Sequence, residues 1–207
     1  MNTIYDRFPE LTAIKESIDD TITSIVAMHR AGGKLLLCGN GGSSADCDHI
    51  VGELMKSFTA DRSLSGADKD ELSTAIGKSA DKFTDKLQYG VPAISLSSQA
   101  AIFTAYVNDV APEMIYAQLV YVLAKKGDVL LAISTSGNSA NVVNAVTLAK
   151  AMGIKTIALT GESGGKLASL CDIAIKAPAS ETYRVQEYHL PIYHHICLEI
   201  ESKLYAQ

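Results

Sequence analysis

The chain lacks any long run of basic residues, and its net charge is −5, from 18 Lys and Arg against 23 Asp and Glu. Tight binding to the phosphates of nucleic acid depends on clustered positive charge, so nucleic acid is not expected as a partner. No stretch is long and apolar enough for a transmembrane helix, and residues 1–6 lack the pattern of a secretory signal peptide. A membrane partner is therefore not expected either.

Cysteine is also scarce. The four cysteines, Cys38, Cys47, Cys171 and Cys197, are scattered without the close pairs typical of structural metal sites. Reduced thiols in such an arrangement favour a cytoplasmic location. Two common phosphate-binding motifs are missing too, because neither a Walker A sequence nor a G-x-G-x-x-G dinucleotide fingerprint stands in its usual place.

What is present indicates a single α/β domain that spans residues 1–207. The composition is 47% hydrophobic and 20% charged, which is ordinary for a soluble protein. Apolar positions spaced by three and four predict an amphipathic N-terminal helix over residues 9–31. Near-continuous apolar runs that alternate with helical segments predict a parallel sheet covered on both faces. The predicted strands are 35–38, 91–96, 128–133, 155–160 and 172–176.

Residues 59–88 differ in character from the rest of the chain. They are rich in Asp, Lys and Ser and contain few large apolar side chains. We expect a surface insertion with one or two short exposed helices, or a mobile excursion, rather than a separate domain.

Loops of small residues follow three of the predicted strands, at residues 40–44, 134–139 and 161–165. Ligands of parallel α/β sheets bind at the carboxyl ends of the strands, where these loops should lie. In the first loop, Ser43 and Ser44 are good N-cap residues for the following helix. The second loop carries four hydroxyl groups in six residues, which together with helix-start N–H groups can surround a phosphate. The alternative is that both loops only cap helices.

Two pairs of residues could carry acid–base or metal chemistry. His49 and Glu53 lie four residues apart on one face of the helix after the first loop. On the last helix, Gln186 and His194 share a broad face, whereas His195 points nearly opposite to Gln186. Pro191 should kink or locally open that helix. The alternative for each group is an exposed polar pair or a packing role.

The sequences Gly39-Asn40-Gly41-Gly42-Ser43 and Ser134-Thr135-Ser136-Gly137-Asn138-Ser139 resemble the two signature loops of the SIS (sugar isomerase) domain. Within that family, the chain is similar to the bacterial phosphoheptose isomerases. These enzymes interconvert sedoheptulose 7-phosphate and D-glycero-D-manno-heptose 7-phosphate. The resemblance implies a flavodoxin-like three-layer sheet flanked by helices, a homotetramer and a sugar-phosphate substrate.

The resemblance also implies roles for individual residues. Glu53 would be the base and His194 the acid of an isomerisation through an enediol(ate). One zinc ion per subunit would be held by His49, Glu53, Gln186 and His194. The phosphate would rest on Ser134, Thr135, Ser136 and Ser139. Further substrate contacts would come from Asn40, Gly41, Gly42, Glu53, Asn108, Asp109 and Gln186.

The chain departs from the family pattern in three places. The segment 59–88 is longer by about 25 residues than the resemblance predicts, and Gln99 and Tyr183 stand near positions where many relatives have Asp. These differences bear on which sugar phosphate is bound. The alternative function is a non-catalytic SIS protein, of the kind that binds sugar phosphates in transcription regulators or binds a replication initiator. That replication regulator lacks the equivalent of Glu53, so its presence here favours catalysis.

Overall fold

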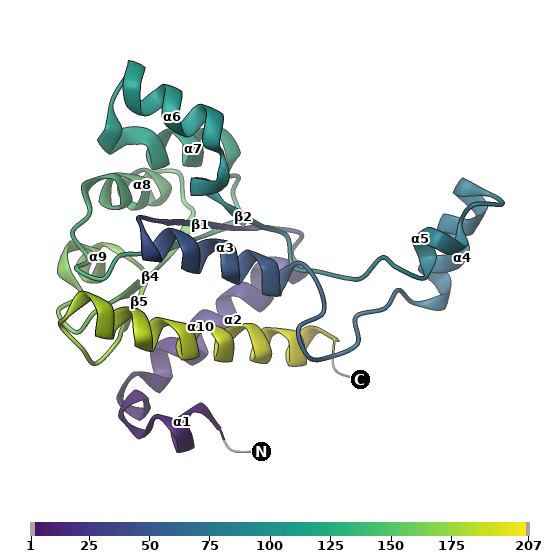
Figure 1. Ribbon diagram of the computed structural model, residues 1–207, viewed down its shortest axis with the longest axis horizontal. Coiled ribbons are helices and arrows are strands. Elements are labelled where there is room, and N and C mark those ends of the chain that lie inside the picture. Colours follow the sequence, from purple (N-terminus) through teal and green to yellow (C-terminus); the bar gives the residue numbers. More distant parts are fainter. Residues whose placement is uncertain (1–2, 206–207) are drawn as a thin grey trace.

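The computed structural model describes residues 3–205, and its centre is a five-stranded parallel sheet (Figure 1). The strand order is β2-β1-β3-β4-β5. This order and the purely parallel pairing confirm the predicted flavodoxin-like α/β fold. All residues of the two central strands β1 and β3 are buried, which explains their continuous apolar sequences. The strands are β1 (Leu35–Gly39), β2 (Ala93–Ser95), β3 (Val129–Ile133), β4 (Lys155–Thr160) and β5 (Ile173–Lys176).

Helices cover both faces of the sheet, and side chains alternate between two cores. In β1, Leu35 and Leu37 enter one core, while Leu36 and Cys38 enter the other. The first core is closed by α2 (Lys15–Arg30), α3 (Gly42–Leu54) and α10 (Thr182–Tyr205). The second is closed by α7 (Ile115–Leu123), α8 (Ala140–Ala151) and α9 (Gly165–Leu170), with α6 (Ala100–Asp109) packed beside α7 (Figure 1).

Several boundaries differ from the sequence prediction. The N-terminal segment is divided into α1 (Ile4–Arg7), a 3₁₀ helix η1 (Pro9–Ile14) and α2, instead of one helix over 9–31. Two further 3₁₀ turns are η2 (Leu96–Ser98), which contains the last residue of the strand predicted at 91–96, and η3 (Pro112–Met114). The short helix α9 was not predicted. Within residues 3–205, none of the helices is long and apolar enough to cross a membrane.

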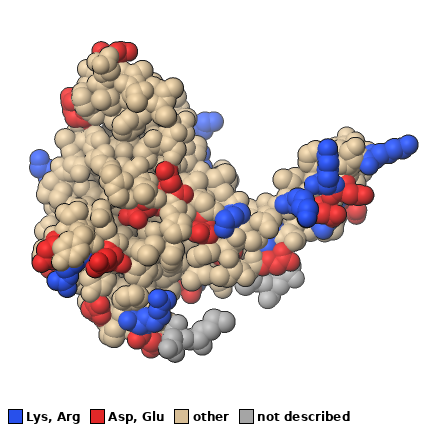
Figure 2. Space-filling view, viewed as in Figure 1, with Lys and Arg blue, Asp and Glu red and all other residues tan. Residues whose placement is uncertain are grey.

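The segment 59–88 forms an arm that projects from the body of the molecule (Figure 1). Its helices are α4 (Gly66–Ile76) and α5 (Asp81–Thr84), and α4 has no buried residue. Figure 2 shows charges of both signs close together on this arm. The helices of this arm are exposed because the sequence of the segment offers too few apolar side chains to build a core.

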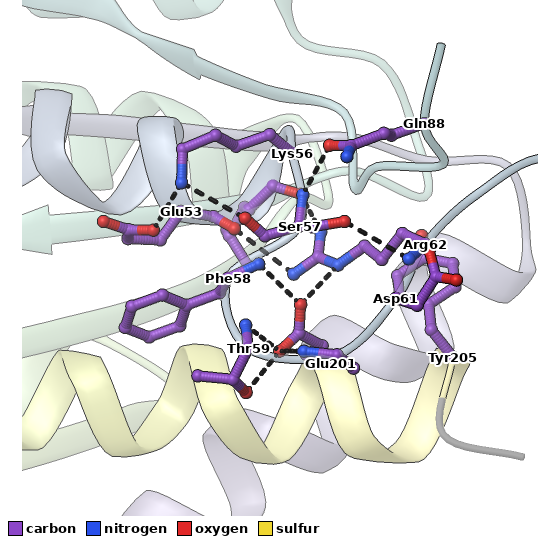
Figure 3. Close-up of polar contacts among 12 residues, drawn as sticks. Glu53, Lys56, Ser57, Phe58, Thr59, Asp61, Arg62, Gln88, Glu201 and Tyr205 are labelled. Atoms are coloured by element: carbon purple, nitrogen blue, oxygen red, sulfur yellow. Dashed lines mark hydrogen bonds and ion pairs between the residues drawn. The ribbon is translucent and has the colours of Figure 1, made fainter. Parts of the chain in front are cut away.

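A buried ion pair fastens the root of the arm to the body (Figure 3). Arg62 Nε donates to Glu201 Oε1 at 2.7 Å, and the two side chains are 0% and 1% exposed. The Glu201 carboxylate also accepts from the backbone N–H groups of Phe58, Thr59 and Ala60 at 2.8–2.9 Å. Burial by itself would raise the pKa of Glu201, but these donors lower it to about 2. The last turns of α10 thereby organise the chain that leaves α3.

We predict that Glu201→Gln lowers the free energy of unfolding by about 3–5 kcal/mol at neutral pH, because Arg62 is left buried without its counter-charge. The folded pKa of about 2 lies below the usual value of 4.5, so the carboxylate stabilises the fold above about pH 4. That contribution is lost as the pH falls toward 2. Over this range the free energy of unfolding of Glu201→Gln should therefore fall less steeply with falling pH than that of the wild type.

Urea unfolding at a series of pH values measures both effects. Asp19→Asn is the control, because the Lys15–Asp19 pair is about half exposed and should contribute less than about 1 kcal/mol. Equal stability losses in the two variants would contradict the assignment.

Candidate active site

The two signature loops meet at the topological switch point of the sheet. From β1 the chain passes to β2 on one side and later to β3 on the other, which opens a crevice at the carboxyl ends of β1 and β3. Gly39 and Ile133 are register partners, so the loops that follow them start side by side. The amides of Asn40 and Asn141 exchange two hydrogen bonds of 2.9 Å across the crevice. The contact of Asn141 with Asn40 was not predicted, because nothing in the local sequence distinguishes Asn141 from any exposed helix residue.

The first loop turns into α3 earlier than predicted. Gly41 is the N-cap residue with φ of +56°, and the helix begins at Gly42. The backbone N–H groups of Ser43 and Ser44 donate to the carbonyls of Asn40 and Gly41. The prediction that these serines cap the helix is therefore wrong, since the positive φ of glycine makes the turn first. Ser43 is buried in the first turn.

Ser44 instead connects α3 to the end of β2. Its hydroxyl donates to Ser97 Oγ at 2.6 Å, and Ser97 in turn lies 3.1 Å from Ser95 Oγ. Asp48, one turn along α3, accepts from the hydroxyl of Ser98. The sequence did not predict these contacts, because serines at the end of a strand do not indicate which residues they will hydrogen-bond.

The second loop is supported by the third. Ser134 Oγ and Ser139 Oγ lie 3.1 Å apart, which closes the loop on itself. The N–H of Gly161 donates to the carbonyl of Thr135 at 3.0 Å, and Asn138 accepts from the start of α9. Gly137 has φ of +65°, and a Cβ added to it would lie 2.1 Å from the carbonyl oxygen of Gly164. The loop thus holds the hydroxyl groups of Ser134 and Ser139 close together at the carboxyl end of β3.

His49, Glu53 and His194 come together where α3 packs on α10. His49 Nε2 lies 3.3 Å from Glu53 Oε1, as their spacing predicts. The ring of His194 is 5.0 Å from that of His49, measured between centroids. His195 packs edge-on to Tyr5 instead, which confirms that the two adjacent histidines point to different sides. The helix continues through Pro191 without interruption, so the predicted opening is wrong; packing on α3 and α2 maintains it.

The surroundings of His194 favour its neutral form. Burial lowers its pKa, the nearby His49 lowers it further, and Glu53 opposes this effect. Its Nε2 atom is buried and has no hydrogen-bond partner among residues 3–205. A neutral imidazole with a free ring nitrogen can exchange a proton with a ligand or bind a metal ion.

The remaining predicted residues lie apart from this cluster. The Gln186 side chain touches Gly42, where an added Cβ would lie 2.4 Å from its Nε2. Gly42 is seven residues before His49, about 10 Å along the helix. Asn108 and Asp109 end α6 and are exposed, and Asn108 Nδ2 donates to Asp109 Oδ1 at 2.7 Å.

The donor set fits a metal ion only in part. His49 Nε2 and Glu53 Oε1 face each other, and the unpartnered His194 Nε2 is near them. Lys56 Nζ lies 3.0 Å from Glu53 Oε2 and supplies a cation to that carboxylate. In the described part of the chain, no three His, Cys, Asp or Glu side chains converge into a ready metal site. The donors are thus of the right kind and close together, and a bound metal requires them to move.

Comparisons with known proteins agree with the fold and the loops. A family model described as "SIS domain" matches residues 82–161. A phosphoheptose isomerase of Aliarcobacter butzleri is 36% identical over 94% of this chain and 89% of its own, and one of Nitratiruptor is 42% identical over 82% and 76%. The structure of a phosphoheptose isomerase from Francisella tularensis has a TM-score of 0.77 at 31% identity, and covers 93% of this chain and 90% of its own.

The match to the SIS-domain model, on a parallel sheet with two hydroxyl- and glycine-rich loops at its switch point, places the chain among the SIS-domain proteins. Within that class, the chain belongs to the phosphoheptose isomerase family.

We predict that Gly137→Ala destabilises the fold more than Gly153→Ala. Both glycines have positive φ, at +65° and +72°, so both substitutions carry the backbone cost of about 1–2 kcal/mol. Only at Gly137 would the new Cβ meet rigid backbone, 2.1 Å from the carbonyl oxygen of Gly164, whereas Gly153 has open space. Thermal unfolding of the two variants tests this, and equal melting temperatures would show that the loops are not held against each other.

Proposed function

We propose that this protein is an aldose–ketose isomerase acting on a sugar phosphate, and that it interconverts sedoheptulose 7-phosphate and D-glycero-D-manno-heptose 7-phosphate. The observation that carries the proposal is the group formed by His49, Glu53 and His194 between α3 and α10. It places a carboxylate beside a neutral imidazole, on the helix that leaves the first signature loop. The family relationship supports the choice of substrate.

Isomerisation moves a proton between adjacent carbons through an enediol(ate), so it needs a base near carbon and an acid near oxygen. We assign Glu53 as the base. Its side chain is 15% exposed, and Lys56 pairs with one oxygen while the other faces His49. His194 is the acid–base partner, because its surroundings lower its pKa and favour the neutral form, and a neutral imidazole can accept a proton and return it.

The serine loop is the proposed phosphate site. Ser134, Thr135, Ser136 and Ser139 surround the carboxyl end of β3, and their hydroxyl groups can donate to phosphate oxygens without a metal ion. Asn40, Gly41, Gly42 and Gln186 then contact the sugar, since Gln186 lies against the first turn of α3. A substrate role for Asn108 and Asp109 stays a prediction from the family resemblance, because their described contact is with each other.

We also propose one zinc ion per subunit, held by His49, Glu53, Gln186 and His194, which requires the Gln186 side chain to leave the first turn of α3 and approach the other three. The mixed nitrogen and oxygen donors suit zinc, and the unpartnered Nε2 of His194 supports it. When bound, zinc would polarise the substrate carbonyl. Assembly as a homotetramer and a cytoplasmic location are further proposals; the four unpaired thiols favour the second. The organisation of residues 1–207 as one SIS domain with an insertion at 59–88 is also a proposal.

Glu53→Gln should abolish isomerisation and leave sugar-phosphate binding measurable, because the amide keeps the shape of the side chain and loses its basicity. The assay is exchange of the C2 proton with deuterated water over a panel of pentose, hexose and heptose phosphates. Glu71→Gln, in exposed α4, is the control and should keep full activity. Full activity of Glu53→Gln would remove Glu53 from the mechanism. No exchange by the wild-type protein with any substrate, with binding retained, would favour a non-catalytic sugar-phosphate-binding protein.

His194→Ala should lose zinc, while His195→Ala should retain it, because only the first ring faces His49. Metal content after dialysis against zinc, measured by mass spectrometry, checks this, with circular dichroism to establish that both variants fold. Zinc bound equally by both variants, or by neither variant nor the wild type, would rule out the proposed ligand set.

A further inference from the structure

A groove with a volume of about 630 Å³ lies between α10, the N-terminal segment and the root of the arm. Much of its lining is apolar, with Leu190, Pro191 and Leu198 from α10 and Ile4 and Phe8 from the N-terminal segment. Leu190 is 42% exposed. A cavity of this size has room for large apolar side chains, and an exposed apolar surface that is not scattered commonly marks a contact with a partner.

Carboxylates line the α10 side of this groove. Glu187 and Glu199 flank the apolar residues of the helix in sequence, and Glu187 is exposed. Neither of them forms an ion pair with another residue of 3–205. Unpaired carboxylates beside an apolar surface favour a partner segment that carries both apolar side chains and cations.

The arm presents such a face on α5. Its helical turn continues to residue 87, because the N–H of Leu87 donates to the carbonyl of Phe83 at 2.8 Å. Phe83 and Leu87 form one stripe of this turn, and they are 38% and 48% exposed. Lys82 and Lys86 form the adjacent stripe, since successive residues lie about 100° apart. Neither lysine forms an ion pair within the described chain. Apolar side chains next to lysines match an apolar groove with an acidic side.

The neck of the arm keeps this face away from the groove of its own chain. Ser63 and Gln88 pair as an antiparallel β-bridge, and the N–H of Tyr89 donates to the carbonyl of Arg62 at 2.8 Å. The ring of Tyr89 stacks on Tyr205 at the end of α10, with ring centroids 6.3 Å apart. Both ends of the arm are therefore fixed beside the C-terminal end of α10, and the arm projects outward from there (Figure 1).

The groove and the arm extend in opposite directions from this root. The groove runs back along α10 from Ser202 to Glu187, which is about 22 Å along the helix. The arm instead projects beyond the C-terminal end of α10 (Figure 1). A two-fold axis close to the roots of two chains lays each arm along the α10 of the other. Such a contact is isologous and closes on itself, because each chain supplies one arm and one groove.

We propose that the groove binds the α5 face of the arm of a second copy of this chain, and that two copies exchange their arms reciprocally. Phe83 and Leu87 enter the apolar part of the groove, and Lys86 faces the partner's Glu187. The inference goes beyond the proposed function and does not rest on it. His194 also lines the groove, so the exchanged arm lies beside the proposed active site.

Chemical cross-linking tests which surfaces meet. Two chains with different tags are co-expressed, one with Phe83→Cys and one with Leu190→Cys, and are treated with a short bismaleimide. We expect a cross-linked dimer that contains both tags. In the control, Tyr121→Cys replaces Leu190→Cys, because Tyr121 is 67% exposed but lies on α7, which closes the other core. Wild-type chains, in which three of the four cysteines are buried, give the background.

A dimer with both tags from the first pair and not from the control would support the proposal. Equal yields from the two pairs, no dimer with both tags, or a monomeric wild type in sedimentation velocity would overturn it. A Leu190→Cys chain that cross-links to itself would assign the groove to the body of a second copy and overturn the arm as its occupant. Cross-linking needs no substrate, so the expected dimer in a protein without isomerase activity would count against the proposed function alone.

Charge reversal tests the facing pair. Lys86→Glu in the arm or Glu187→Lys in the groove should lower the cross-linking yield about fivefold, because each replaces attraction between surface charges by repulsion. The two substitutions together should restore the yield. Asp85→Lys is the control and should change the yield less than about twofold, since Asp85 lies on the side of the turn opposite Phe83 and Leu87. A double variant that stays as weak as the single variants would overturn the pairing of Lys86 with Glu187.

Discussion

The parallel register of β1 and β3 is the constraint on which the rest of the structure depends. Parallel strands bring their carboxyl ends to one edge of the sheet. The chain passes from β1 to β2 on one side of β1, and β3 lies on the other side of β1. The loops after Gly39 and Ile133 therefore start side by side, and the Asn40–Asn141 amide pair joins the segments that follow. A shift of register by one residue would move the apolar side chains of these strands to the wrong core and separate the loops.

The packing of α3 on α10 is the second determinant. Both helices belong to the core that contains Leu35 and Leu37, and the polar residues lie at the edge of that contact. His49 and Glu53 come from one helix and His194 from the other, so their geometry depends on apolar burial elsewhere along the two helices. The same two helices, α3 and α10, therefore hold the proposed active-site residues and close the first core.

The buried pair of Arg62 and Glu201 connects this contact to the arm. Arg62 also donates to the carbonyl groups of Glu53 and Leu54 at the end of α3, and Figure 3 shows its guanidinium group between Glu53 and Glu201. A cation at a helix C-terminus stabilises the helix, and here it is fixed by a carboxylate from the last turns of α10. The insertion can therefore extend into solvent while its root keeps the end of the Glu53 helix in place.

The sequence by itself determined the alternation of strands and helices, the two signature loops and the His49–Glu53 pair, because each depends on periodicity or local spacing. It also separated His194 from His195, since a helix places neighbours about 100° apart. Only the tertiary structure decided the early start of α3 at Gly42, the unbroken α10 at Pro191, and the partners of Asn40 and Arg62. These features depend on groups that are distant in sequence, and a hydrogen-bond partner in another element leaves no periodic trace in either segment.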